Sequence, residues 1–245
     1  MSNVFSLTNY LPEDMRANLR HPVRAFKYLL ETINTAFARK FLGSYSQHGE
    51  DIIIARLLKG VKKGFYVDIG ANDPEVISNT KYFYECGWRG INIEPHPEMY
   101  QKITEKRQED TNLNVGIASQ EGELTFYKLD KENETAGSTF DRNVAEELTK
   151  KGYVISAEIK MPVVSLAKVL SENAAGKKID FMSVDTEGFD LEVIKSNDWN
   201  TYRPTVLIIE TTINKEEIIN FILEQNYKIV SQNLANTIFK DNLSE

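Results

Sequence analysis

Acidic residues stand where two predicted strands end. Asp68 lies in the apolar run FYVDI and is followed by Gly70 and Asn72, and Glu94 closes the next run, GINIE, 24 residues after Gly70. Consecutive parallel strands bring their carboxyl ends to one edge of a sheet, where a strand-end acid can accept hydrogen bonds from ribose hydroxyls. Gly70 permits a backbone conformation, or a close ligand approach, that a side chain would block. Either acid alone is as easily structural, but the pair favours a nucleoside-containing ligand.

The glycine loop also narrows the choice of ligand. The dinucleotide fingerprint G-x-G-x-x-G is incomplete, since Asn72 and Asp73 follow Gly70 where further glycines would let the backbone approach a pyrophosphate. This disfavours NAD and FAD and favours a ligand with ribose and adenine but no phosphate, which describes S-adenosylmethionine. An NAD-type oxidoreductase, or a non-catalytic nucleotide-binding protein on the same fold, remains the alternative.

The segment DTEGFD, 185–190, carries three carboxylates within six residues. Transfer of a methyl group to a hydroxyl requires a group that takes the proton, and Asp185 is the first candidate base, assisted by Glu187. Asp190 is expected to begin a helix as an N-terminal acid. In a second hypothesis, Asp185 and Glu210 at adjacent strand ends bind Mg²⁺, which would lower the pKa of a bound hydroxyl.

Two further stretches carry polar candidates. In YSQHGED, Gln47, Glu50 and Asp51 are expected to cover the amino-acid end of the cofactor. His48 is a second candidate base because its ordinary pKa is near neutrality. Ser78 and Asn79 would either cap the following helix or reach the same end of the cofactor. The residues leave these two roles open.

The positioning elements follow from apolar patterning. Short apolar runs alternate with amphipathic segments, which predicts parallel βαβ units and an open, doubly wound α/β sheet that ends in an antiparallel hairpin. A β insertion or lid is expected at about 120–165, built from ELTFYKL and ISAEIKMPVV, with a polar substrate-selecting segment at 130–153. The predicted strands are 65–69, 90–94, 113–118, 179–185 and 205–211, and the predicted helices are 50–58, 80–85, 97–107 and 215–225, with another around Leu191.

The ordered set of motifs YSQHGED, FYVDIGAND, SNTKYFYECGWRGINIEPHP, SVDTEGFDLEVI and RPTVLIIE resembles the FkbM-type methyltransferases, a branch of the class I S-adenosylmethionine-dependent enzymes. The resemblance runs from about Ser44 to Glu210. It implies a seven-stranded Rossmann-like fold and O-methylation, commonly of sugar or polyketide hydroxyls. It also implies that Glu94 binds the ribose and that Gly116 and Ile117 lie near the adenine. The full predicted cofactor-binding set is Gln47, Glu50, Asp68, Gly70, Ala71, Asn72, Ser78, Asn79, Glu94, Pro95, Gly116, Ile117 and Asp185.

Charge divides the chain into an arm and a main domain, predicted at 1–43 and 44–245. The net charge is −7, which argues against broad nucleic-acid binding. Residues 1–42 hold six Lys or Arg against three acids, which gives +3 and leaves −10 for the remainder. Apolar residues at helical spacing predict an amphipathic basic helix over 23–41. That helix would either pack on the domain or hold an anionic acceptor, or else contact a membrane or glycolipid.

Composition also bears on location. Cys86 is the single cysteine, so an intrachain disulfide is excluded, and the N-terminus shows no basic start followed by an apolar stretch. No apolar run approaches the roughly 20 residues that span a bilayer. The expected setting is the cytoplasm, with the basic helix as a possible membrane contact. The expected partner is a small-molecule or glycan acceptor, and the oligomeric state is left open.

Overall fold

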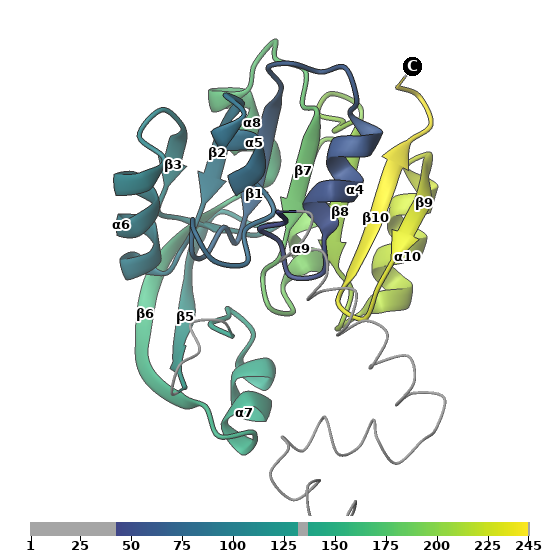
Figure 1. Ribbon diagram of the computed structural model, residues 1–245. Helices are drawn as coiled ribbons and strands as arrows, with labels where there is room; N and C mark the ends of the chain where they lie inside the picture. Colours follow the sequence, from purple (N-terminus) through teal and green to yellow (C-terminus); the bar gives the residue numbers. More distant parts are fainter. Residues whose placement is uncertain (1–42, 132–136, 245) are drawn as a thin grey trace, which may run out of the picture.

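The computed structural model describes residues 43–131 and 137–244, and their backbone forms a seven-stranded sheet with helices on both faces (Figure 1). The strand order is β3-β2-β1-β7-β8-β10-β9. β1 pairs in parallel with β2 and with β7, and β10 runs antiparallel to β8 and β9. The strands are β1 (Phe65–Ile69), β2 (Arg89–Ile93), β3 (Thr111–Leu113), β7 (Phe181–Val184), β8 (Val206–Glu210), β9 (Tyr227–Gln232) and β10 (Asn236–Asp241). This architecture confirms the predicted fold class, including the closing hairpin.

Helices cover the two faces of the sheet through two separate apolar cores. One core joins Val67, Ile93 and Leu207 to α8, α9 and α10, and the other joins Tyr66 and Phe181 to α4 and α5. Central strands such as Phe181–Val184 are buried at every position, as expected of a parallel sheet covered on both faces. The helices are α4 (Glu50–Leu57), α5 (Lys81–Glu85), α6 (Pro97–Lys106), α8 (Leu166–Asn173), α9 (Asp190–Lys195) and α10 (Lys215–Glu224).

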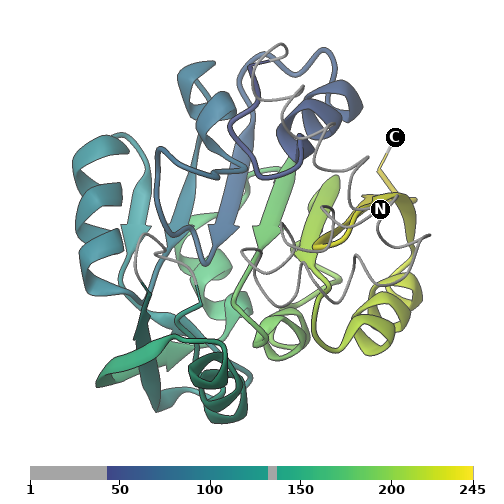
Figure 2. The same cartoon turned by 60° about the horizontal axis from the view of Figure 1, so that its bottom comes forward.

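The predicted insertion is present and lies beyond the carboxyl ends of the parallel strands (Figures 1 and 2). β5 (Gly122–Asp130) and β6 (Val154–Val164) form a long antiparallel pair, and β4 (Gly116–Ile117) pairs with β6 to complete a three-stranded sheet. α7 (Arg142–Lys150) occupies the segment predicted only as polar. It begins at Asp141, whose Oδ1 accepts the backbone N–H groups of Asn143 and Val144, as is typical of a helix N-cap.

The predicted third strand, 113–118, is wrong in its extent. The main sheet takes only Thr111–Leu113, and Gly116–Ile117 belongs to the insertion sheet. Asn114 stands at the break, where its Nδ2 donates to the carbonyl oxygens of Glu94 (2.7 Å) and Pro95 (3.0 Å). Those two bonds hold the chain against the end of β2 while it turns away from the sheet.

Two predictions concern regions at the limits of the described chain. The basic helix over 23–41 lies outside the described residues, so the division into an arm and a main domain stays a prediction. Within residues 43–131 and 137–244, no helix combines the length and the apolar character needed to cross a membrane.

Candidate functional site

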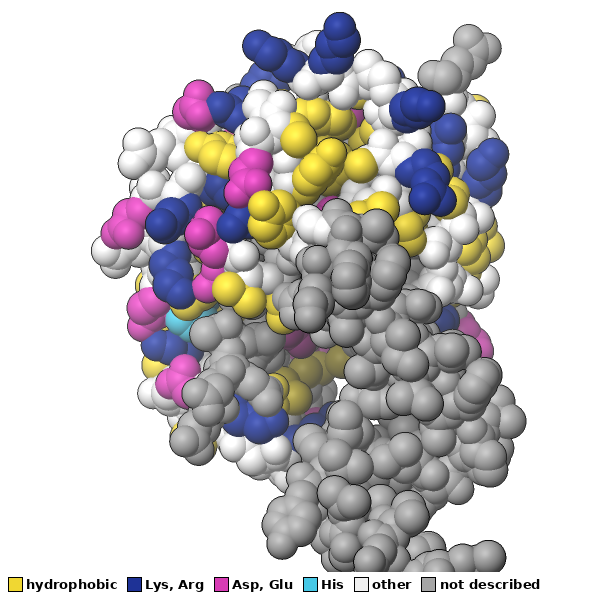
Figure 3. All heavy atoms as spheres, viewed as in Figure 1, with side chains coloured by type: hydrophobic (Ala, Val, Ile, Leu, Met, Phe, Trp, Pro, Cys, Tyr) yellow, Lys and Arg dark blue, Asp and Glu magenta, His cyan; other side chains and the backbone are white. Residues whose placement is uncertain are grey.

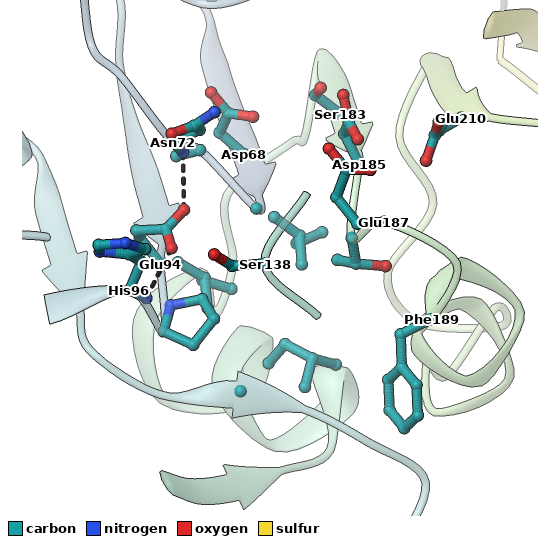
Figure 4. A pocket seen from close by; sticks show the side chains of 18 of the residues that line it. Asp68, Asn72, Glu94, His96, Ser138, Ser183, Asp185, Glu187, Phe189 and Glu210 are labelled. Carbon is teal, nitrogen blue, oxygen red and sulfur yellow. Dashed lines mark hydrogen bonds between the residues drawn. The ribbon is translucent and has the colours of Figure 1, made fainter. Parts of the chain in front are cut away.

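A pocket of about 500 Å³ lies where β1, β2, β7 and β8 end, between these strand ends and the insertion. β1 is the point at which the strand order reverses, because the chain continues to β2 and β3 on one side and returns through β7 and β8 on the other. Doubly wound sheets bind ligands in this crevice. Figure 4 shows the residues that follow β1 and β2 on one side of the hollow and those that follow β7 and β8 on the other. The predicted residues that line it are Gln47, Asp68, Gly70, Ala71, Asn72, Ser78, Asn79, Glu94, Pro95, Gly116, Ile117, Asp185, Glu187 and Glu210.

Gly70 is required by the backbone around it. Its φ is 76°, in the left-handed region, and a Cβ atom placed there would lie 1.8 Å from the carbonyl oxygen of Asp185. The Gly70 N–H donates to the Ile93 carbonyl (2.9 Å), while the Asp185 N–H donates to the Ile69 carbonyl (3.0 Å). The loop after β1 is therefore fixed between the ends of β2 and β7, which is a packing role that sequence could not separate from ligand approach.

Glu94 orders the same loop from the end of β2. Its Oε2 accepts the N–H of Asn72 and its Oε1 accepts the N–H of His96, each at 2.7 Å (Figure 4). Burial raises the pKa of Glu94 to about 7, although the two backbone donors act in the opposite direction. Each carboxylate oxygen can accept a further hydrogen bond. Glu94 is thus oriented, buried and able to receive two hydroxyl donors.

Asp68 lies behind this loop and is 5% exposed. Its Oδ2 accepts the hydroxyl of Thr80 at 2.7 Å. Burial raises the pKa of Asp68 to about 6, and the Thr80 hydroxyl and the Arg107 guanidinium partly offset this rise. Asn79 donates from Nδ2 to the hydroxyl of Ser183 on β7 at 3.1 Å, so the 71–80 loop is joined to the strand that ends at Asp185.

The insertion supplies a wall that the sequence did not reveal. The rings of Phe126 and Phe140 lie 5.0 Å apart between centroids, and Phe140 lies 5.8 Å from Phe189 after β7. A Cβ atom on Gly116 would lie 2.4 Å from Cζ of Phe140, so the glycine admits this ring. The segment AGSTFDRN was predicted as part of a lid, but no periodic pattern identifies Phe140 as a pocket residue.

Asp185 and Glu210 stand side by side at the ends of β7 and β8. Val184 pairs with Ile209 across these parallel strands, which makes the next two residues neighbours. Burial is the main cause that raises the pKa of Asp185 well above its ordinary range, and the nearby carboxyls of Glu210 and Glu187 add to it. Burial also raises the pKa of Glu210 to about 8. Glu210 Oε1 accepts the Thr212 hydroxyl, whereas its buried Oε2 has no hydrogen-bond partner among the described residues.

Glu187 connects the end of β7 to the insertion. Its φ is 52°, and its Oε1 accepts the N–H of Gly137 at 3.1 Å while its carbonyl oxygen accepts the Thr139 hydroxyl at 2.9 Å. Burial, followed by the charge of Asp190, raises the pKa of Glu187. Asp190 begins α9, as predicted, and its carboxylate accepts the N–H groups of Thr186 and Gly188.

The stretch YSQHGED divides between the pocket and the scaffold. Gln47 lines the pocket, whereas His48, Glu50 and Asp51 do not. Glu50 is fully buried, and its Oε1 accepts the side-chain amides of Asn233 and Asn236, both at 2.8 Å. These bonds join α4 to the β9–β10 hairpin, so the structure gives Glu50 a scaffold contact rather than a place in the pocket.

The metal hypothesis rests on Asp185 and Glu210 alone. Within the residues that the structure describes, no group of three or more His, Cys, Asp or Glu side chains is arranged to hold a metal ion. The Asp185–Glu210 pair offers hard oxygen atoms of the kind that Mg²⁺ prefers, but further ligands would have to come from water or from a substrate.

Comparison with known proteins identifies the domain. A model of the methyltransferase FkbM domain matches residues 68–229, which is more than half of the chain. The matched segment runs from the aspartate in β1 through the insertion to β9. A search among curated proteins found no matching sequence.

A search among solved structures found matches that share little sequence with this chain. A TehB-like SAM-dependent methyltransferase from Corynebacterium glutamicum is 10% identical, with 91% of this chain and 100% of that chain covered and a TM-score of 0.43. A precorrin 8w decarboxylase from Methanobacterium thermoautotrophicum is 13% identical, with 78% and 88% covered and a TM-score of 0.41. The Burkholderia thailandensis 1,6-didemethyltoxoflavin-N1-methyltransferase, solved with S-adenosylhomocysteine, is 13% identical, with 95% and 91% covered and a TM-score of 0.40.

Proposed function

Because the chain belongs to the FkbM methyltransferase family, we propose that it transfers a methyl group from S-adenosylmethionine to a sugar hydroxyl. The observation that carries this proposal is the shared pocket at the strand ends, which is lined both by Glu94 after β2 and by Asp185 after β7. One acid is suited to hold a nucleoside and the other to take a proton. The family match favours methyl transfer over the hydride transfer of an NAD-type oxidoreductase.

The side of the pocket after β1 and β2 fits the cofactor. Glu94 is held by two backbone N–H groups and keeps acceptor capacity for the two ribose hydroxyls. Gly116 and Ile117 line the neighbouring wall with Phe126 and Phe140, which offers an apolar slot for a base. When bound, S-adenosylmethionine supplies a methyl group on a sulfonium, and transfer to a hydroxyl yields a methyl ether, S-adenosylhomocysteine and one proton.

Asp185 is the residue that we assign to that proton. It lies at the end of β7 with Gly70 packed against its backbone, and its carboxyl lines the pocket beside Glu210. A carboxylate in a buried site among other acids binds a proton more tightly than one in water, which makes it a better general base. Glu187 has a backbone φ of 52° and accepts the N–H of Gly137 in the insertion. From this position it would hold the acceptor next to Asp185.

Mg²⁺ is the alternative means of activating the hydroxyl. Asp185 and Glu210 would supply two carboxylate ligands, vicinal sugar hydroxyls could supply two more, and the metal would lower the pKa of the reacting hydroxyl. Treatment with a chelator separates the two mechanisms. Loss of turnover that added Mg²⁺ restores would assign the metal, whereas unchanged turnover would assign proton transfer to Asp185 alone.

The function is tested by transfer of a labelled methyl group from S-adenosylmethionine to a panel of free sugars, glycosides, nucleotide sugars and glycan extracts. Calorimetry with S-adenosylhomocysteine and with NAD runs in parallel on the full chain. We expect S-adenosylhomocysteine to bind, NAD not to bind, and label to appear as an alkali-stable ether on a sugar. Binding of NAD in place of S-adenosylhomocysteine would refute the methyltransferase assignment, and label on amines alone would refute the hydroxyl assignment.

A further inference from the structure

The lining of the pocket is rich in carboxyl groups. Five carboxyl side chains line it, and within the described residues no Lys or Arg does. Proteins hold phosphate groups and carboxylates chiefly with Arg, Lys and helix N-termini. On the face shown in Figure 3, Lys and Arg side chains are spread over the outer surface, at the top, along both sides and near the bottom.

The acids on the β7 and β8 side make an anionic acceptor unfavourable. Asp185, Glu187 and Glu210 come from two adjacent strand ends and face the same hollow (Figure 4). A phosphate or diphosphate placed beside them would bring about two negative charges next to groups that already disfavour one another's ionised form, with no Lys or Arg among the described lining residues to balance them. Neutral hydroxyl groups, in contrast, can donate hydrogen bonds to these carboxylates.

Two exposed apolar residues also line the pocket. Val76 and Ile77 line the pocket, yet they are 58% and 51% exposed. Ile77 has a φ of 56°, a conformation that β-branched residues rarely adopt because it crowds the Cβ atom. Exposed apolar side chains that line a pocket are typical of surfaces that contact a ligand.

The turn that carries these two residues is held in place by hydrogen bonds. Asp73 Oδ1 accepts the N–H groups of Glu75 (2.8 Å) and Val76 (3.1 Å). Two residues after Ile77, Asn79 bonds to Ser183 on β7. The apolar side chains are therefore fixed on a turn joined to the strand that ends at Asp185, within the same pocket.

We infer that the acceptor is an uncharged glycoside with an apolar aglycone, whose sugar lies among the acids after β7 and β8 and whose aglycone lies on Val76 and Ile77. The inference rests on the proposed function and narrows it, because it excludes nucleotide-linked and phosphorylated sugars as the preferred acceptors. Free hydrophobic glycosides and glycolipids share this chemistry.

Matched acceptors test the inference on the full chain. For each sugar in the panel, kcat/KM is measured for the free sugar, its octyl glycoside, its 1-phosphate and its nucleotide diphosphate derivative. We expect kcat/KM for the octyl glycoside to be roughly tenfold higher than for the free sugar, and to exceed kcat/KM for the phosphorylated forms by a larger factor. A higher kcat/KM for a phosphorylated or nucleotide-linked form would overturn the inference while leaving the methyltransferase assignment intact. Failure of every sugar, with S-adenosylhomocysteine binding retained, would overturn both the sugar assignment and the inference.

A variant at the mouth tests the aglycone contact. Ile77→Asn removes the apolar side chain, and asparagine tolerates a positive φ, so the turn is expected to fold. The ratio of kcat/KM for the octyl glycoside to that for the free sugar should fall about fivefold or more. The matched control is Leu223→Asn on α10, where an apolar residue that is 42% exposed lies outside the pocket lining. An unchanged ratio in Ile77→Asn would contradict the aglycone placement.

A free hydrophobic glycoside and a membrane glycolipid are distinguished by comparing the same sugar in solution and in a vesicle. Octyl glycoside below its micelle concentration is compared with the same sugar carried by a glycolipid in phosphatidylcholine vesicles. Turnover of either supports the inference, and the larger kcat/KM identifies the source. Turnover of neither, with phosphorylated sugars active, would overturn it.

Discussion

At the scale of single residues, the site depends on carboxyl groups whose surroundings differ. Glu94 is oriented by two backbone N–H groups, whereas Asp185 faces other acids and Glu210 keeps a buried oxygen without a partner among the described residues. Burial raises the pKa of each group. The first is therefore suited to accept hydrogen bonds from a ligand, and the second to accept a proton.

The Glu94 assignment predicts a pH-dependent affinity for S-adenosylhomocysteine. Ionised Glu94 accepts two hydroxyl donors, and its pKa in the free protein is about 7, so binding should tighten by up to about tenfold between pH 6 and pH 8. Glu94→Gln should weaken binding by roughly tenfold or more and remove most of this pH dependence. Calorimetry at the two pH values measures both effects. Glu105→Gln, an exposed change on α6, is the control, and an unaltered affinity in Glu94→Gln would disprove the ribose contact.

The Asp185 assignment predicts separable effects on binding and turnover. Asp185→Asn keeps the side-chain shape but removes the proton acceptor, so kcat should fall by roughly 10² to 10⁴. The affinity for S-adenosylhomocysteine should fall less than it does in Glu94→Gln, because the ribose contact of Glu94 stays in place. Glu224→Gln, an exposed acid on α10, serves as the control. Full turnover by Asp185→Asn on a true acceptor would eliminate both the base and the metal roles.

At the scale of elements, the loop after β1 is held by its neighbours as much as by its own sequence. Gly70 packs against the backbone of Asp185. The Asn72 N–H donates to the Glu94 carboxylate, and the Asn79 side-chain amide donates to the Ser183 hydroxyl. The insertion reaches the same strand ends through the contacts of Gly137 and Thr139 with Glu187. The site is therefore shaped jointly by the ends of β1, β2 and β7 and by the insertion.

Gly70→Ala tests this joint dependence against a glycine with similar backbone geometry. Gly87 has a φ of 85° and nothing within 4 Å of a Cβ atom, so Gly87→Ala should cost only the backbone strain of about 1 to 2 kcal/mol. Gly70→Ala has the same strain and a clash with the Asp185 carbonyl, and should cost at least 2 kcal/mol more. Denaturant unfolding measures the difference, and calorimetry should show lost cofactor binding in Gly70→Ala only. Equal free energies of unfolding for the two variants would contradict the packing role of Gly70.

At the scale of the whole molecule, a set of buried acids lies along one edge of the sheet. Burial raises the pKa of Asp68 and of Asp190 to about 6 and that of Glu94 to about 7. Each group binds its proton more tightly in the folded chain than in the unfolded chain. The stability that results is present below the unfolded pKa and is lost as pH rises through the folded values.

The unliganded protein should therefore be more stable at pH 5.5 than at pH 8. We expect a fall in Tm of roughly 3 °C or more across this interval, measured by thermal unfolding at constant ionic strength. Asp68→Asn should reduce the fall, because that position no longer titrates and the amide oxygen can still accept the Thr80 hydroxyl. A Tm that rises with pH in the wild-type chain would show that these acids are not buried as described.

The sequence by itself determined the alternation of strands and helices and the acids at the strand ends. Both follow from local patterns, because an apolar run that ends near Asp68, Glu94 or Asp185 indicates a strand end whichever strands pair with it. The same local patterns predicted the position of the insertion and the start of α9 at Asp190. It failed where the outcome depended on distant partners, as when Asn114 bonds to the end of β2 and divides the predicted third strand.

Only the tertiary structure decided which polar residues serve the scaffold and which face the pocket. Glu50 and Gln47 stand three positions apart, yet Glu50 binds the β9–β10 hairpin and Gln47 lines the cavity. Phe140 becomes part of the wall because its ring packs against Gly116 in β4, and Ile77 lines the pocket although its side chain is 51% exposed. Burial, charge balance and backbone clash arise from residues that the chain brings together across long separations, and no local pattern encodes them.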